Sequence, residues 1–186
     1  MGGRIGRLDS AVHLVILGLD SAGKSTVLYQ LKFHQYIDTV PTIGFNCEKT
    51  RHCGVNFTIW DVGGQDRVRP LWRSYTRSTD GIIFVVDSRD LERIDEAKVE
   101  LLKTARVPET LGVPIVILAN KQDLPGSRDP MEIEKLLGLD EQLGGRPWAV
   151  RPACAVTGEG LNEALEEIHR MIIKRRLTLK QAKRKR

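Results

Sequence analysis

Long apolar stretches and cysteines are scarce in this sequence of 186 residues. No run reaches the roughly 18 apolar residues of a transmembrane helix, and the N-terminus lacks the apolar stretch of a secretory signal, so we expect a cytoplasmic protein. The three cysteines, Cys47, Cys53 and Cys154, form no C-x-x-C pair. Their number and spacing predict neither a disulfide framework nor a zinc site.

The positive charge is concentrated at one end of the chain. Eight basic residues and no acidic residue lie in 174–186, which leaves 21 basic against 24 acidic residues, a net charge of −3, in residues 1–173. A mildly acidic body with a compact cationic segment argues against a protein whose whole surface binds nucleic acid. The basic residues of this tail are Lys174, Arg175, Arg176, Lys180, Lys183, Arg184, Lys185 and Arg186.

Short apolar runs alternate with amphipathic stretches along the chain. The runs predict strands at 12–17, 55–60, 82–86, 115–119 and 149–153, and the periodic stretches predict helices at 24–33, 91–105, 131–137 and 161–176. Residues 45–50 and 55–61 flank a short polar turn and predict an antiparallel hairpin at one edge. We therefore expect an α/β domain over 12–173, with a six-stranded, mostly parallel sheet flanked by helices, between a leader at 1–11 and the tail at 174–186.

The first predicted strand leads directly into the motif G-x-x-x-x-G-K-S at residues 18–25, and a predicted helix follows. In this context backbone N–H groups and the helix N-terminus bind phosphate, the lysine adds a point charge, and the serine hydroxyl is a Mg²⁺ ligand. The predicted phosphate-binding residues are Asp20, Ser21, Ala22, Gly23, Lys24, Ser25 and Thr26.

The phosphate motif alone fits ATPases, kinases and GTPases, so the base must be recognised elsewhere. Asn120-Lys121-Gln122-Asp123 follows a later strand. The Asp123 carboxylate can accept from two adjacent donors of guanine, where adenine presents the opposite pattern. A nucleotide kinase is an alternative, but it would need an arginine-bearing lid for which the chain has no insertion. A module that holds GTP without hydrolysing it is a second alternative.

Further motifs complete a family pattern. Residues 41–46 read PTIGFN, residues 61–65 read DVGGQ, and Cys154-Ala155 follows the last predicted strand. With these motifs the chain resembles the ADP-ribosylation factor family of small GTPases over about residues 14–173. The basic tail and the residues around 28–29 and 69–72 are most similar to the Arf-like-4 subgroup.

The resemblance implies a role for each matching residue. Gln65 would orient the attacking water, Gly64 would donate to the γ-phosphate, and Thr42 and Asp61 would join Ser25 in holding Mg²⁺, Asp61 through water. The guanine site would comprise Asn120, Lys121, Asp123, Cys154 and Ala155. No arginine is visibly supplied in cis, and Arg67 and Arg69 are expected to face solvent or a partner.

The implied function is a GTP/GDP switch with slow hydrolysis, with GTP or GDP and Mg²⁺ as cofactors. A monomer is expected, with an exchange factor, an activating protein and effectors as partners, in vesicle trafficking or cytoskeletal and membrane signalling. The predicted partner surface is apolar. It consists of Phe45, Trp60, Leu71, Trp72 and Tyr75.

Both ends of the chain suggest membrane attachment. Gly2 is available for myristoylation, although Gly6 stands where that motif expects a hydroxyl. Because one acyl chain binds reversibly, the basic tail would supply a second signal through anionic lipids. The expected location is peripheral on the plasma membrane or endomembranes. The alternative for the tail is a nuclear import receptor or nucleic acid, which would place the protein in the nucleus.

Overall fold

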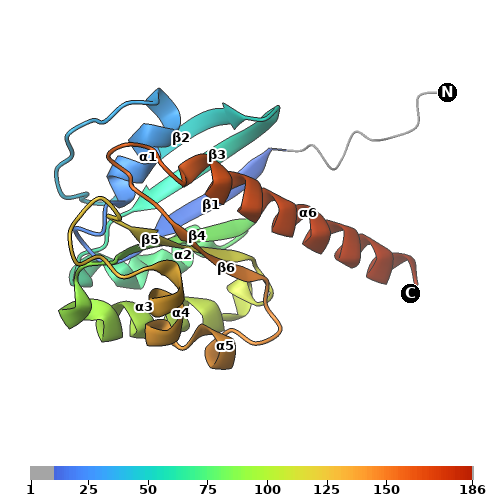
Figure 1. The fold of residues 1–186 in the computed structure, drawn as a ribbon. Coiled ribbons are helices and arrows are strands. Elements are labelled where there is room, and N and C mark those ends of the chain that lie inside the picture. The colour runs from blue at the N-terminus through green and yellow to red at the C-terminus, as the bar shows by residue number, and fades with distance from the viewer. Residues whose placement is uncertain (1–10, 186) are drawn as a thin grey trace.

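A six-stranded sheet in the order β2-β3-β1-β4-β5-β6 forms the centre of the molecule in the computed structural model (Figure 1). The structure describes residues 11–185. Only β2 and β3 pair antiparallel, which confirms the predicted hairpin and the mostly parallel sheet. The strands are β1 (Val12–Leu17), β2 (Phe45–His52), β3 (Val55–Val62), β4 (Gly81–Asp87), β5 (Ile115–Asn120) and β6 (Trp148–Pro152).

Helices cover both faces of this sheet. They are α1 (Lys24–Phe33), α2 (Trp72–Thr76), α3 (Ile94–Arg106), α4 (Pro130–Leu137), α5 (Leu139–Gln142) and α6 (Leu161–Arg184), with short 3₁₀ turns at Asp66–Leu71, Leu91–Arg93 and Pro108–Thr110. Alternation along β1 sets the layers: Leu14 and Ile16 pack with α1 and α6, whereas Val15 and Leu17 pack with α2, α3, α4 and α5.

The carboxyl ends of the parallel strands meet at one edge of the sheet, where ligands of such folds bind. At this edge β1 ends in Gly18, whose backbone has φ +145°, and a Cβ there would overlap the carbonyl oxygen of Val85 on β4. A side chain at Gly18 would therefore push the phosphate loop away from the sheet.

Helix α6 is longer than the sequence pattern predicts. It continues from the expected end near residue 176 to Arg184, and its last turns extend beyond the body of the protein (Figure 1). The added segment lacks glycine and proline and is rich in good helix formers. The start of this added segment is held against the body of the protein, because Arg176 forms an ion pair with Asp80 at 2.9 Å.

Parts of both predicted ends of the chain lie outside the described residues. These are residues 1–10 of the predicted leader, including Gly2, and Arg186 of the predicted tail. Among residues 11–185, no helix combines the length and the apolar character that a bilayer crossing requires.

Candidate functional site

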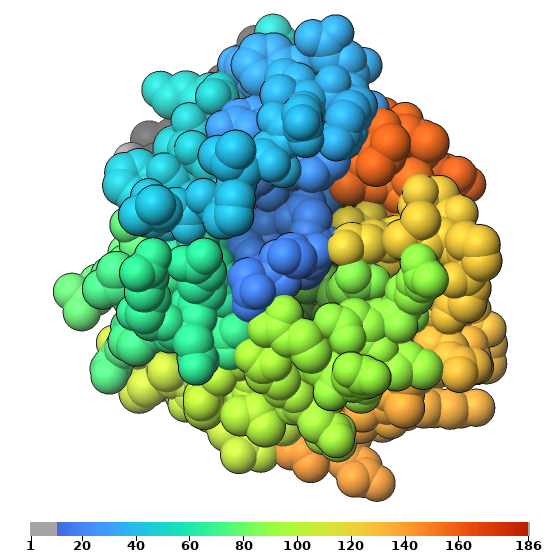
Figure 2. Space-filling view, turned by 90° about the vertical axis from the view of Figure 1, so that its left-hand side faces the viewer, coloured from blue at the N-terminus to red at the C-terminus, as the bar shows by residue number. Residues whose placement is uncertain are grey.

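A hollow of about 300 Å³ lies at the carboxyl edge of the sheet. Figure 2 shows the phosphate loop, in blue, at the bottom of a depression framed by segments that are far apart in the sequence. The lining comes from 20–21, 23–26, 39–42 and 64–65, with Lys121 also in the lining, whereas Ala22 of the phosphate loop is buried. The fold thus brings the predicted phosphate-binding residues next to the predicted catalytic glutamine.

Lys24 is a buried cation at the floor of this hollow. It begins α1 directly after Gly23, and its Nζ donates to the carbonyl oxygen of Leu19 at 2.7 Å. Burial lowers the pKa of Lys24 to about 8, and the nearby Asp61 carboxylate partly opposes that shift. Within residues 11–185 no carboxylate lies within ion-pair distance of Nζ. A cation held in this way is available to a phosphate group.

Three oxygen-bearing side chains converge beside Lys24. The Ser25 hydroxyl donates to Asp61 Oδ2 at 2.5 Å and lies 2.8 Å from the Thr42 hydroxyl, and Asn46 Nδ2 also donates to Oδ2 at 3.2 Å. Asp61 is fully buried, yet its second oxygen, Oδ1, has no hydrogen-bond partner. An unpartnered carboxylate oxygen among hydroxyls fits a hard cation such as Mg²⁺, which prefers oxygen ligands.

The opposite side of the hollow is a closed network of hydrogen bonds. Asn120, buried at the end of β5, donates to the carbonyl oxygen of Ala22 at 2.9 Å and accepts from the Ala155 amide at 3.0 Å. Lys121 donates to the carbonyl oxygen of Ser21 at 2.8 Å and pairs with Asp87 at 2.7 Å. The loops after β1, β4, β5 and β6 are thus fastened to one another.

Two further predicted base-site residues differ in their exposure. Asp123 is exposed to solvent, so its carboxylate is accessible at the rim. Cys154 is buried, and its amide donates to Glu159, which shapes the loop after β6. The contribution of Cys154 to this site is therefore that of a small buried side chain.

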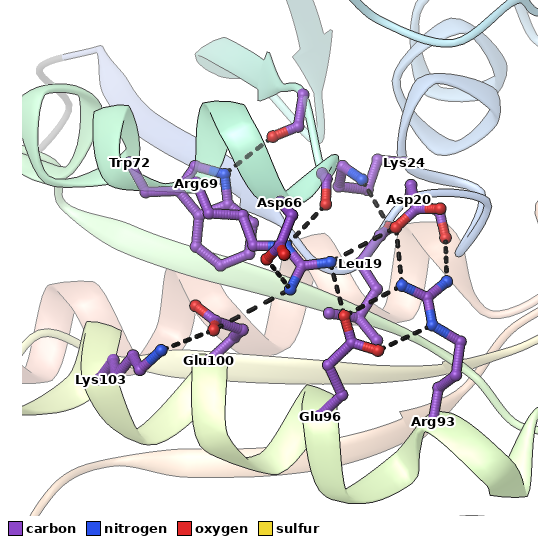
Figure 3. A network of polar contacts seen from close by, with 12 residues as sticks. Leu19, Asp20, Lys24, Asp66, Arg69, Trp72, Arg93, Glu96, Glu100 and Lys103 are labelled. Atoms are coloured by element: carbon purple, nitrogen blue, oxygen red, sulfur yellow. Dashed lines mark hydrogen bonds and ion pairs between the residues drawn. The ribbon is translucent and has the colours of Figure 1, made fainter.

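Arg69 corrects one expectation from the sequence. It does not face solvent: its side chain is 6% exposed, and Nε donates to the carbonyl oxygen of Gly64 at 2.8 Å. The guanidinium also pairs with Glu96 at 2.8 Å and with Asp20 at 3.4 Å (Figure 3). The buried charge is compensated by four carboxylates at 2.8–3.9 Å, those of Asp20, Asp66, Glu96 and Glu100.

Arg93 completes the network from the amino end of α3. It pairs with Asp20 at 2.7 Å and with Glu96 at 2.9 Å. Hydrogen bonds from Arg93 lower the pKa values of both Asp20 and Glu96, so both carboxylates stay ionised. The sequence motifs predict no role for Arg93 or Glu96. Their spacing of three residues at a helix start was the available signal, but it does not show that the phosphate loop lies above them.

Gly64 and Gln65 approach the phosphate loop closely. A Cβ on Gly64 would overlap Lys24 Nζ and the backbone of Asp20, so this position accepts no side chain in the observed arrangement. Gln65 follows and lines the hollow. The expected residues 64 and 65 are therefore at the site.

Of the five residues predicted to contact partners, three aromatic residues lie together and one, Trp72, is buried. Phe45, Trp60 and Tyr75 form a cluster with ring centroids 5.1, 5.5 and 6.0 Å apart, and Phe45 and Leu71 are each about half exposed. Trp72 is only 3% exposed, and its indole N–H donates to the carbonyl oxygen of Gly63 at 2.9 Å. Trp72, the first residue of α2, packs into the core and is not part of this surface.

Comparison with known proteins agrees with this geometry. The sequence model of the ADP-ribosylation factor family matches residues 3–172. This chain belongs to the ADP-ribosylation factor family. Its sequence is similar to that of ADP-ribosylation factor-like protein 4A of Homo sapiens, at 57% identity over 94% of this chain and 90% of the relative. Human ADP-ribosylation factor-like proteins 4C and 4D are 53% and 48% identical over 94% and 95% of the chain, and over 94% and 90% of their own lengths.

A solved structure agrees with the fold of this Arf-family protein. The Arl6 BBS3 small GTPase from Trypanosoma brucei, with the bound nucleotide analogue GppNp, superimposes with a TM-score of 0.82 at 30% identity, over 89% of this chain and 99% of that one. These matches confirm the predicted family, the Arf-like-4 resemblance and the fold. The chain is a small GTPase that binds GTP or GDP with Mg²⁺, hydrolyses GTP and acts as a switch in trafficking. Its general partners are exchange factors, activating proteins and effectors.

Proposed function

We propose that this Arf-family chain is a membrane-associated switch whose two halves divide the work of binding: one half recognises the base, and the other senses the γ-phosphate. The observation that carries the proposal is the buried Asp61, whose unpartnered oxygen lies beside the hydroxyls of Ser25 and Thr42. Thr42 is supplied by a segment without regular structure, so the completeness of this cluster depends on where that segment lies.

The phosphate loop binds the nucleotide through its backbone and Lys24. Asp20, Ser21 and residues 23–26 line the hollow at the N-terminus of α1, where backbone amides favour anions. Ser25, Thr42 and Asp61, the last through water, would hold Mg²⁺, which when bound neutralises charge on the phosphate oxygens. Lys24 adds its positive charge from the floor of the hollow.

The base is selected on the other side. Asp123 accepts from the two donors of guanine, and Lys121 lies along the ring, anchored by Ser21 and Asp87. Asn120 holds the surrounding loops together. The Ala155 amide, proposed to donate to the guanine carbonyl oxygen, already donates to Asn120, so it would share or exchange that partner on binding.

Hydrolysis requires a residue that orients water and charge that stabilises the transition state. Gln65 lines the hollow and is the candidate for the first task. Arg69, which pairs with Asp20 of the phosphate loop, is held by the Gly64 carbonyl and by Glu96 and is not free to reach a phosphate. This arrangement favours slow intrinsic hydrolysis that an activating protein accelerates.

The single-turnover rate of GTP hydrolysis tests the role of Gln65. We expect Gln65→Leu to slow the rate by about 10²-fold while the affinity for GTP stays within about twofold, because the change removes a polar positioning group and no binding contact. A matched control is Gln122→Leu, a glutamine of the base-side loop that lies outside the hollow. An unchanged rate in Gln65→Leu would remove this residue from the mechanism.

The aromatic cluster and Leu71 are proposed as the effector surface. Phe45 begins β2, Trp60 lies on β3 and Tyr75 lies on α2. Phe45 thus follows Thr42 closely in the chain, and Trp60 and Tyr75 lie before and after Gln65. An apolar surface built in this way changes shape when either segment moves.

The end of α6 is proposed as a membrane-docking element. Leu177 and Leu179 are exposed beside the basic residues Lys180, Lys183 and Arg184 on a helix that extends from the body. Apolar and basic groups on one helix favour an anionic bilayer surface. Myristoylation of Gly2 would add a second attachment, and the protein would reside peripherally on the plasma membrane or endomembranes.

Vesicle flotation tests the role of the tail. Replacing Lys183, Arg184 and Lys185 by glutamine should weaken binding to phosphatidylserine-containing vesicles by at least tenfold, and added salt should mimic the change. The control neutralises three exposed basic residues elsewhere, Arg77, Arg89 and Lys135. Equal flotation of wild type and tail variant would favour the nuclear import interpretation.

A further inference from the structure

The tip of the β2–β3 hairpin meets α6 through three metal-binding side chains. His52 ends β2, Cys53 lies in the turn, and Glu166 projects from α6, 114 residues after His52. His52 Nε2 lies 2.9 Å from Glu166 Oε1 and 3.3 Å from Cys53 Sγ, and Sγ lies 3.7 Å from the same carboxylate oxygen. An imidazole, a thiol and a carboxylate thus point at one spot.

These separations match those of ligands around one zinc ion. With zinc–ligand bonds of about 2.0–2.3 Å and tetrahedral angles, neighbouring donor atoms lie about 3.3–3.6 Å apart. The three observed separations differ from those values by at most about 0.4 Å. The donors would need only small side-chain shifts to share an ion.

The local structure holds the donors in place and leaves one side open. Cys53 and Gly54 both have positive φ, 46° and 79°, which makes the tight turn that brings the thiol beside the imidazole. The His52 side chain is 20% exposed and the Glu166 side chain 58%, so a fourth position faces water. Such an open three-ligand site is a known zinc arrangement.

The neighbouring arginines are paired with another carboxylate. Arg151 and Arg170 both form ion pairs with Glu167, at 2.7 and 2.6 Å, and neither forms an ion pair with Glu166 among residues 11–185.

We propose that His52, Cys53 and Glu166 bind a zinc-type divalent cation that ties the hairpin tip to α6. Nitrogen and sulfur donors select Zn²⁺ over Mg²⁺, whereas Ser25, Thr42 and Asp61 offer only oxygens. The two cation sites therefore differ in chemistry and lie at opposite ends of the hairpin, since His52 pairs with Val55 and Asn46 pairs with Asp61. Binding transfers the thiol proton of Cys53 to solvent. The cysteine spacing gave no hint of the site, because Glu166 joins it only in the fold.

Metal titration of the untagged, full-length protein tests the site. The protein is loaded with GDP in excess Mg²⁺, which keeps Zn²⁺ away from the nucleotide, and Zn²⁺ is titrated against a chromophoric chelator. We expect one ion per chain, and with Co²⁺ in place of Zn²⁺ a thiolate-to-cobalt charge-transfer band. His52→Ala and Glu166→Gln should weaken binding by at least tenfold, because losing a ligand costs no less than losing an outer-shell partner.

The decisive pair of variants changes one cysteine of the same hairpin at a time. Cys53→Ser should abolish the charge-transfer band and the zinc-induced rise in Tm, whereas Cys47→Ser should leave both intact. Bound GDP and the circular dichroism spectrum show that each variant is folded. Absence of stoichiometric binding in the wild type, or binding that survives Cys53→Ser, would overturn the proposal. Neither outcome bears on GTP hydrolysis, so the switch function stands or falls separately.

Discussion

The two sides of the nucleotide hollow are built differently. On the base side, Asn120 and Lys121 are fully engaged with the loops that surround them. On the magnesium side, the buried Asp61 has an unpartnered oxygen, and Thr42 comes from an exposed segment without regular structure. The part that binds features common to GTP and GDP is preformed, whereas the part that would contact the γ-phosphate is left incomplete. A switch needs both properties at once.

The strongest test of the base side is Asp123→Asn. Loss of two charge-assisted hydrogen bonds should weaken GTP and GDP binding equally, by about 10²–10⁴-fold, because the base is the same in both. Xanthine nucleotides, which present the complementary pattern to an amide, should bind better than in the wild type. Competition binding with the four nucleotides measures both effects, and a loss confined to GTP would contradict a preformed base side.

Arg69 joins the Gly64 segment to the phosphate loop and α3, so its loss should lower stability. Arg69→Ala leaves the Gly64 carbonyl without its donor and leaves Asp20 and Glu96 with Arg93 alone, and we expect the free energy of unfolding to fall by about 2–3 kcal/mol. Arg73→Ala is the control, because Arg73 is exposed and forms an ion pair with the single carboxylate of Glu109 within residues 11–185. We expect this substitution to cost at most about 1 kcal/mol. Urea unfolding of the GDP-bound proteins measures both, and equal losses would show that the network contributes little.

Ser25→Asn tests the magnesium side of the hollow. The larger amide cannot replace the hydroxyl beside Asp61 and Thr42, so GTP retention should fall by about 10–100-fold, with a smaller loss for GDP. Nucleotide dissociation rates in Mg²⁺ and in EDTA measure the effect. An equal loss for both nucleotides would remove Ser25 from the role assigned to it, and Ser127→Asn in the base-side loop is the matched control.

The pH dependence of GTP affinity tests the role of Lys24, and it is the smallest of the expected effects. Its pKa of about 8 in the free protein lies below the ordinary value of 10.5, and phosphate binding favours the protonated form. Affinity for GTP should therefore fall about tenfold between pH 7.5 and 9, and this ratio should disappear in Lys24→Ala. In the nucleotide-free protein, the unfolded chain binds more protons between pH 8 and 10.5, so the free energy of unfolding should rise with pH over that window. A flat affinity profile would show that Lys24 keeps its proton.

The motif residues could be placed from the sequence because each follows a strand, and parallel strands bring their carboxyl ends together. That rule located Lys24, Gln65 and Lys121 at one hollow. It could not identify the partners of Asp20, because Arg69 and Arg93 reach it from elements whose packing the periodicity does not specify.

Two further differences have a similar origin. Trp72 appeared to be a surface residue from its position after the switch motif, but its indole N–H finds a buried carbonyl and its ring fills the core beside Phe84. Helix α6 continues through the basic tail because nothing in that segment breaks a helix, although the apolar periodicity fades. Local pattern thus predicts elements, while long-range polar contacts become visible only in the fold.

Amide hydrogen exchange on the GDP-bound and GppNp-bound protein tests the central claim most directly. The account predicts that protection changes in the segments containing Thr42 and Gln65 and in the β2–β3 hairpin, while residues 120–123 and 153–158 exchange identically in both states. Identical exchange throughout the chain, or changes centred on residues 120–123, would contradict the division into a preformed base side and a responsive magnesium side.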